Sequence, residues 1–296
     1  MKKIITLVLA LAMCLSCFAG CGGEDSGENG NSNNSSATAE TEYTPVDKMA
    51  TALLEIKSGT ADAAVVDSVM AEAMVGEGTD YSDLMIVDGI TLAEEEYAIG
   101  FRDGSTAVEP INEAIEALYA DGTVAELAEK YNLSLSLIDE FKASEEEGVT
   151  PDTEADDWGE IQNKGTLVIG ITEYAPMNYY DENGTLVGFD TEFAQAVCDY
   201  LGLEAEFIVI NWGMKETELQ SKNIDCLWNG MTVTEELMEN IDFSGSYMYN
   251  KQVIVIDSAS ADNYTDIESF KGASFVAEQG SAGEGVVQQL IEDGTL

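Results

Sequence analysis

Asp67 stands at the end of the apolar run Ala61–Val66, where a carboxylate is costly to bury unless a cation or a hydrogen-bond donor accompanies it. The ammonium group of a ligand would be such a partner. Aspartate also suits the N-cap of a helix, and Ser68–Val75 is a helix-like segment that follows directly. Asp67 therefore favours either the binding of a cation or the capping of a helix.

A glycine-rich segment, Gln279–Gly283 (QGSAG), precedes a helix-like stretch at Gly283–Leu290. Backbone amides at the N-terminus of a helix bind anions such as carboxylates. Such helix starts are common without ligands, so this segment alone is weak evidence. With Asp67, it would suit a ligand that carries both an ammonium and a carboxylate.

The composition excludes several kinds of function. The chain has 12 Lys and Arg against 57 Asp and Glu, a formal charge of −45, and no histidine. Phosphate binding needs clustered basic side chains, so nucleic acid is excluded as a partner and anionic lipid headgroups are disfavoured. Without histidine there is no Ser-His-Asp triad, no His-ligated zinc and no imidazole base. We expect no metal and no cofactor.

The N-terminal region has the pattern of an export signal. In residues 1–21, two lysines precede an apolar stretch too short for a membrane span, and FAGC ends it at Cys21. This end resembles a bacterial lipobox with phenylalanine in place of the common leucine, so Cys21 is expected to carry lipid; an ordinary signal peptide is the alternative. Residues 22–43 are expected to form a flexible tether. Cys198 and Cys226, in apolar segments, are either core side chains or a disulfide.

The remainder of the chain alternates between two kinds of apolar pattern. Helical spacing predicts helices at 47–59, 68–75, 108–118, 124–131, 157–165, 191–201, 215–222 and 283–290. Short apolar runs predict strands at 61–67, 84–87, 96–101, 166–171, 204–210, 224–228, 251–257 and 274–278. This alternation predicts an α/β fold with mostly parallel sheets and helices on both faces.

Several motifs resemble one known family. DCLWNGMTVTEE and IDFSGSY, between residues 225 and 247, resemble the signature of bacterial extracellular solute-binding proteins (family 3) that deliver polar amino acids to ABC importers. GTLVIGITEYAPM and NGTLVGFD, between residues 165 and 190, resemble the usual opening of that family. The closing half of the family pattern is visible in Ile56–Asp67 and Tyr97–Tyr131. What resembles the end of the family pattern therefore comes first in this chain.

The resemblance implies a periplasmic-binding-protein-like (type II) fold of two lobes, each a mostly parallel sheet flanked by helices, with the halves in permuted order. The parts expected are 44–89 in the second lobe, 90–133 returning to the first lobe, 134–155 as an acidic linker, 156–257 as the main part of the first lobe, 258–272 as a hinge, and 273–296 as the start of the second lobe. A circular permutant is favoured, with a domain-swapped dimer and a rearranged gene as alternatives. A permutant requires strand Ala61–Val66 to pair with strand Ser274–Glu278.

The same resemblance implies a ligand site between the lobes, built from two aromatic walls, a loop after the third strand, an acid and a helix start. The residues at these positions are, in that order, Tyr174 and Trp212; Asn229, Gly230 and Thr232; Asp67; and Ser281 and Ala282. The aromatic walls would sandwich the ligand side chain. The acid would pair with the ligand ammonium, together with the glycine carbonyl of the loop. The threonine of the loop and the helix start would hold the carboxylate.

Two positions depart from the family pattern. Leu237 stands where the family has an arginine that binds the ligand carboxylate, so either Lys215 or Arg102 replaces it, or the ligand is not a plain α-amino acid. Ile171 stands where members that bind cationic amino acids often have aspartate, which disfavours a strongly cationic ligand side chain.

These features favour the substrate-binding subunit of an ABC importer, which would capture a polar amino acid or a related small solute, work with a membrane permease, and be anchored as a lipoprotein at the outer face of the cell membrane. It would be a monomer or a domain-swapped dimer, and not an enzyme. One alternative is a secreted prephenate- or arogenate-dehydratase-like enzyme on the same fold, for which Asp67 and, less well placed, Glu173 are the candidate acids. A sensory ligand-binding module is the other alternative.

Overall fold

The computed structural model describes residues 40–143 and 156–296. The expected signal peptide with Cys21, residues 22–39 of the expected tether, and residues 144–155 of the expected linker lie outside the described residues. Among the residues that are described, no helix is long and apolar enough to cross a membrane.

A ten-stranded mixed sheet forms the centre of the described chain, in the order β1-β12-β2-β11-β4-β9-β5-β8, with β3 paired to β11 and β10 paired to β4. Its strands are β1 (Glu42–Val46), β2 (Ala63–Asp67), β3 (Leu84–Ile86), β4 (Ala93–Arg102), β5 (Thr166–Ile171), β8 (Glu204–Val209), β9 (Cys226–Thr232), β10 (Ile241–Phe243), β11 (Met248–Asp257) and β12 (Ser274–Glu278). A separate small ribbon pairs β6 (Tyr179–Tyr180) with β7 (Leu186–Val187).

Helices cover this sheet. The α-helices are α1 (Met49–Ser58), α2 (Ser68–Met74), α3 (Val108–Asp121), α4 (Thr123–Lys130), α5 (Asp157–Lys164), α6 (Phe189–Leu201), α7 (Lys215–Gln220), α8 (Glu235–Met238) and α9 (Ala282–Glu292). Short 3-10 helices are η1 (Trp212–Met214), η2 (Ser258–Asn263) and η3 (Ile267–Phe270). The predicted α/β fold is confirmed.

The first lobe is built on β9, β5 and β8, which run parallel to one another. Alternate residues of β5 point to opposite faces of the sheet. On one face Ile169 joins the core cluster that contains Phe193 of α6, and on the other Val168 packs with Leu219 of α7. Helices therefore cover both faces of this parallel core.

The second lobe repeats the arrangement on β1, β12 and β2, which are also parallel. Val66 of β2 belongs to the cluster that contains Leu53 of α1, whereas Val65 belongs to the cluster that contains Val287 of α9. The helices α1 and α9 therefore lie on opposite faces of this sheet, as the βαβ pattern predicts.

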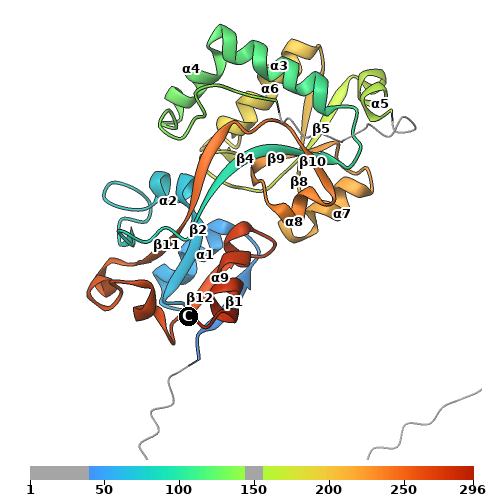
Figure 1. Cartoon of the computed structure of the whole chain (residues 1–296). Coiled ribbons are helices and arrows are strands. Elements are labelled where there is room, and N and C mark those ends of the chain that lie inside the picture. Colours follow the sequence, from blue (N-terminus) through green and yellow to red (C-terminus); the bar gives the residue numbers. More distant parts are fainter. Residues whose placement is uncertain (1–39, 144–155) are drawn as a thin grey trace, which may run out of the picture. The chain divides into compact units, whose positions relative to one another are not determined.

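Two long strands, β4 and β11, connect the lobes (Figure 1). Each has 10 residues, and the two pair with each other antiparallel around Met248 and Tyr97. Beyond that pairing, β11 continues beside β2 and β4 continues beside β9. Residues 258–272, expected to be the hinge, instead form η2 and η3 and pack into the second lobe through Phe270. The connection between the lobes is therefore made inside continuous strands.

The two halves of the chain share one sheet, as the permutation requires. Strand β12 pairs parallel with β2, with Phe275 opposite Ala63 and Val276 opposite Ala64. The chain from β4 then returns to the first lobe, where α3 and α4 contact α6. Both parts of this prediction are confirmed.

Other details differ from expectation because tertiary packing recruits segments with weak local signals. Strand β1 begins at Glu42, inside the segment expected to be a tether, because its backbone extends the sheet beside β12. Inside the segment 134–155, expected to be a linker, Phe141 is buried and the Ile138 amide donates to the Tyr247 carbonyl. Cys198 and Cys226 are both buried free thiols, so they are core side chains and not a disulfide.

Candidate functional site

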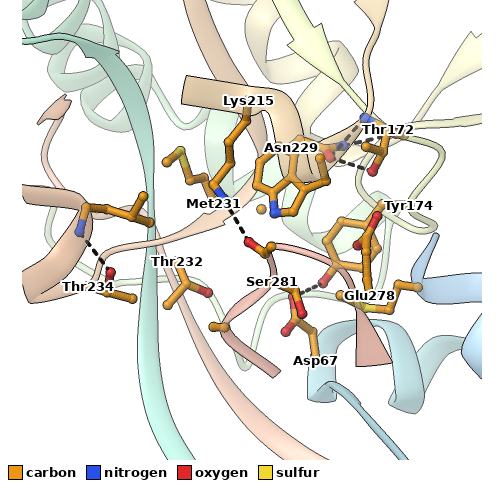
Figure 2. A pocket seen from close by; sticks show the side chains of 16 residues that line it. Asp67, Thr172, Tyr174, Lys215, Asn229, Met231, Thr232, Thr234, Glu278 and Ser281 are labelled. Atoms are coloured by element: carbon orange, nitrogen blue, oxygen red, sulfur yellow. Dashed lines mark hydrogen bonds between the residues drawn. The ribbon is translucent and has the colours of Figure 1, made fainter. Parts of the chain in front are cut away.

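A small pocket lies where the two lobes meet, and both lobes contribute residues to its wall (Figure 2). The residues that the sequence analysis assigned to a ligand site all line this pocket: Tyr174, Trp212, Asn229, Gly230, Thr232, Asp67, Ser281 and Ala282. The folding of two distant halves thus brings every one of them to one place.

Asp67 is the last residue of β2 and has only 4% of its surface exposed. It occupies the N-cap position of α2, yet its side chain makes no capping hydrogen bond. Instead, the hydroxyls of Tyr97 and Tyr174 donate to its Oδ2 at 2.7 and 3.0 Å, and Gln252 Nε2 donates to its Oδ1. The helix-cap interpretation of Asp67 is therefore wrong, and the carboxylate faces the pocket.

Burial raises the pKa of the Asp67 carboxyl, and the hydrogen bonds from Tyr97, Gln252 and Tyr174 act in the opposite direction. An ionised group in this position is costly to desolvate. A cation that entered the pocket would offset that cost, because opposite charges attract more strongly where water is excluded. Asp67 is therefore placed to attract a ligand ammonium.

The two aromatic walls are held in different ways. Tyr174 is fixed by the bond to Asp67 and by a 2.6 Å contact between its hydroxyl and that of Tyr97. Trp212 opens η1, whose first turn is capped by the Asn211 side chain. The ammonium of Lys215 lies 5.4 Å from the centre of the Trp212 ring.

Asn229, Gly230 and Thr232 lie inside β9, so the prediction that they form a loop after the strand is wrong. Strand β9 continues because its pairing with β4 resumes at Met231 after an irregularity in register. The Asn229 side chain is committed to the protein: its Oδ1 accepts from Thr172 N and Oγ1, at 3.0 and 2.8 Å, and its Nδ2 donates to Thr172 O and to an Asn178 oxygen. Asn229 therefore fixes the end of β5 next to the pocket.

Gly230 is required by its backbone and by its neighbours. Its φ is +56°, in the left-handed region, and a Cβ placed there would lie 2.6 Å from Tyr174 Cε1 and 3.0 Å from Tyr97 Cε2. Its amide donates to Asp190 Oδ2 at 2.6 Å. The glycine lets the strand pass directly behind the aromatic wall.

The start of α9 forms part of the second-lobe wall. The Ser281 hydroxyl caps the helix by accepting from the Glu284 amide at 3.1 Å, and Ala282 begins the helix. The Ser281 hydroxyl oxygen is engaged in this cap. What faces the pocket is therefore mainly the N-terminus of α9, where an anion is favoured.

Of the two cations that could replace the family arginine, only Lys215 lies at the pocket. Its ammonium donates to the Gly280 carbonyl of the second lobe at 2.7 Å (Figure 2), and burial lowers its pKa. Arg102 donates instead to backbone carbonyls of the first lobe and pairs with Asp157 at 3.4 Å. Leu237 lines the pocket, as its place in the family pattern implies.

Glu278, the last residue of β12, is a pocket residue that the sequence analysis missed. Only 4% of its surface is exposed, and burial, followed by the charge of Asp67, raises the pKa of its carboxyl to about 8. The sequence did contain a signal for it: like Asp67, Glu278 ends a short apolar strand.

Among the residues that the structure describes, no group of Cys, Asp and Glu side chains could hold a metal ion. The other acid considered for catalysis, Glu173, pairs with Lys48 at 2.6 Å and is outside the pocket wall. The arrangement therefore offers acids, a buried lysine, helix amides and aromatic rings, which together suit the binding of a small charged solute.

The part of the chain that forms most of the first lobe and the start of the second is similar to known proteins. Residues 167–295 match the family described as "Bacterial extracellular solute-binding proteins, family 3". This part of the chain is similar to that family. The match includes Tyr174, Trp212 and Glu278 and does not include Asp67.

Individual relatives match over similar lengths. The L-cystine-binding protein TcyJ of Escherichia coli (strain K12) is 27% identical over 133 residues, which is 45% of this chain and 50% of that protein. The arginine-binding extracellular protein ArtP of Bacillus subtilis (strain 168) is 32% identical over 127 residues, 43% of this chain and 49% of that protein. The chain thus spans about half the length of the curated relatives that it matches.

Among solved structures, a polar amino acid ABC uptake transporter substrate-binding protein from Streptococcus thermophilus is 37% identical over 31% of this chain and 35% of that chain, with a TM-score of 0.29. That score is too low to support an argument about the fold, which here stands on the chain's own strand pairing.

Proposed function

We propose that this protein captures a polar amino acid or a close analogue between its lobes as the substrate-binding subunit of an ABC importer, exported and held at the outer face of the cell membrane through lipid on Cys21. The observation that carries the proposal is the convergence of Asp67, Tyr174, Trp212 and the start of α9 on one pocket. Relatives of the matched part are named for cystine and arginine binding, which supports an amino acid as the ligand.

The pocket also suits capture by closure of the lobes around a ligand. Contacts that join the two lobes surround it: Tyr174 with Asp67 at 3.0 Å, the Lys215 ammonium with the Gly280 carbonyl at 2.7 Å, and Lys48 with Glu173 at 2.6 Å. A ligand with both charges would interact with both walls at once, and a ligand that binds the closed state better shifts the lobes toward it.

We expect purified residues 22–296 to be stabilised by at least one member of a panel of polar amino acids that includes arginine and cystine. A ligand at about 100 times its Kd adds about 2.7 kcal/mol to the free energy of unfolding, which raises the melting temperature measurably in a thermal-shift assay. A folded sample that shows no shift with any member of the panel would contradict the proposal.

The dehydratase-like alternative has less support. Glu173 is paired outside the pocket, and the Asp67 carboxylate already accepts three hydrogen bonds. Such an enzyme would have to use Glu278 as its acid. Formation of an aromatic keto acid from prephenate, or of an aromatic amino acid from arogenate, followed by absorbance in the same preparation, would favour this alternative over a binding protein.

We also propose that the two halves are a circular permutation within one chain. Leu296 and Tyr43 pack against the same core cluster, and Tyr43 Oη donates to Glu284 of α9 at 2.8 Å, so β1 and the residues after α9 are neighbours. The alternative domain-swapped dimer would keep these contacts but make them between chains.

A relinked chain tests the permutation. Residues 156–296 joined directly to residues 42–143, which keeps the buried Phe141, should fold as a monomer and bind the same ligand. Its free energy of unfolding should lie within about 2 kcal/mol of the parent, because only loop closure has changed. Light scattering and urea denaturation measure both quantities, with the parent order as the control. A parent that is dimeric in solution and a relinked chain that does not fold would favour the swap.

A further inference from the structure

The carboxyl group of Glu278 is an acceptor in the pocket wall that the protein leaves unused. Only 4% of the surface of Glu278 is exposed, and its Oε1 has no hydrogen-bond partner among the described residues. A buried polar atom without a partner is uncommon and costs free energy. Because the residue lines the pocket, a group that enters the pocket can supply the missing donor.

The charged groups around Glu278 come from several elements, and none of them neutralises it. Asp67 at the end of β2 repels its charge, and the Glu284 carboxylate of α9 is occupied by the Gly280 amide at 2.6 Å. Lys215 of α7 and Lys48 before α1 attract it. Their ammonium groups, however, bind the Gly280 carbonyl and the Glu173 carboxylate, and neither forms an ion pair with Glu278 in the described part of the chain.

A count of charges shows what kind of ligand fits. A neutral amino acid has one ammonium, which Asp67 would satisfy, and one carboxylate, which Lys215 and the amides at the start of α9 would satisfy. Glu278 would then remain as a second, unmatched acid. A ligand with a second basic group would use both acids.

Resting on the proposed function, we infer that Glu278 is the subsite for a cationic group on the ligand side chain, so that the pocket selects amino acids with a terminal guanidinium or amine over neutral ones of the same size. The expectation from Ile171 is thereby reversed. Ile171 is fully packed in the core and is not part of the pocket wall, so the acid that is missing there is supplied from β12.

The surroundings of Glu278 also make this selection depend on pH. With its pKa raised to about 8, Glu278 is mainly protonated near neutral pH when the pocket holds no cation. A ligand cation favours the carboxylate and lowers its pKa in the complex, so binding releases a proton. Affinity for a cationic ligand therefore rises with pH up to about 8 and is constant above it.

Arginine and citrulline form a suitable pair of probes, because they share shape and differ in side-chain charge. Protonation of Asp67 changes the affinities for arginine and for citrulline equally. The ratio of the two affinities therefore reports on Glu278. We expect the parent protein to prefer arginine by at least tenfold near pH 8, with the preference shrinking toward about pH 6, in isothermal titration calorimetry. Titrations in buffers of different ionisation enthalpy should show proton release with arginine only.

The variant Glu278→Gln should bind both probes with nearly equal affinity and lose the pH-dependent ratio, whereas Glu268→Gln, an acid in η3 away from the pocket wall, should behave as the parent does. Circular dichroism checks that both variants fold. A parent that binds citrulline as tightly as arginine would overturn the inference while leaving the proposed function intact. Failure of every amino acid in the panel to bind the folded parent would overturn both.

Discussion

Replacing Asp67 with asparagine is expected to weaken ligand binding by at least a hundredfold. The substitution keeps the size of the side chain and removes the charge that a ligand ammonium would meet. Loss of one partner of a buried, hydrogen-bonded charge pair costs about 2–5 kcal/mol, and a hundredfold change corresponds to about 2.7 kcal/mol. Calorimetry with the tightest ligand of the thermal-shift panel measures the change.

Asp83→Asn is the matched control, because Asp83 lies in the second lobe as well but pairs at the surface with Lys57. That variant should bind the ligand as the parent does. Binding by Asp67→Asn that equals the control would mean that the ammonium is held elsewhere, with Glu278 the first residue to examine.

Gly230→Ala is expected to lower the free energy of unfolding by about 2–5 kcal/mol and to reduce binding. An alanine in left-handed backbone geometry costs about 1–2 kcal/mol, and forcing a methyl group into a packed region costs about 1–3 kcal/mol more. The methyl group would lie 2.6 Å from Tyr174 Cε1, so the ring that forms one wall of the pocket has to move. Urea denaturation gives the stability change and calorimetry the affinity.

Gly184→Ala separates the two contributions. Gly184 also has a positive φ, of 78°, but no atom lies within 4 Å of a Cβ built there. It should therefore lose only the backbone contribution, about 1 kcal/mol, and keep its affinity. Equal losses of unfolding free energy in the two variants would show that Tyr174 moves aside without destabilising the protein. The close approach at Gly230 would then be unimportant.

Most of the pocket could be predicted from the sequence because its residues match the family pattern, whose motifs lie where strongly patterned elements end. The run that stops at Asp67 and the strand at 166–171 before Tyr174 are short, apolar and bounded by polar residues, so their ends are visible without a structure. The pairing of β12 with β2 could also be predicted, since the order of the family motifs places both strands in one lobe and each gains a hydrogen-bonded neighbour at its edge.

Other features depend on contacts that no local pattern reveals. Asn229 and Gly230 were expected in a loop, but pairing with β4 keeps them in a strand. Strand β1 and the segment around Phe141 have ordinary polar sequences and gain their structure from the surfaces they meet. Whether an acid such as Glu278 has a partner is decided by three elements at once, so its unpaired state is visible only in the assembled pocket.

The pairing of β2 with β12 also has a consequence for how the chain folds. Asp62 and Ser274, which hydrogen-bond beside this pairing, are 212 positions apart, and β11, the other neighbour of β2, is nearly as distant in sequence. Contacts with large sequence separation carry a high loop-closure entropy and slow the crossing of the folding barrier. The segment from β1 to α4 therefore cannot complete its sheet until the segment from β5 to α9 is present. We expect refolding to be slow for a protein of this size and to have a nucleus that draws strands from both ends of the chain.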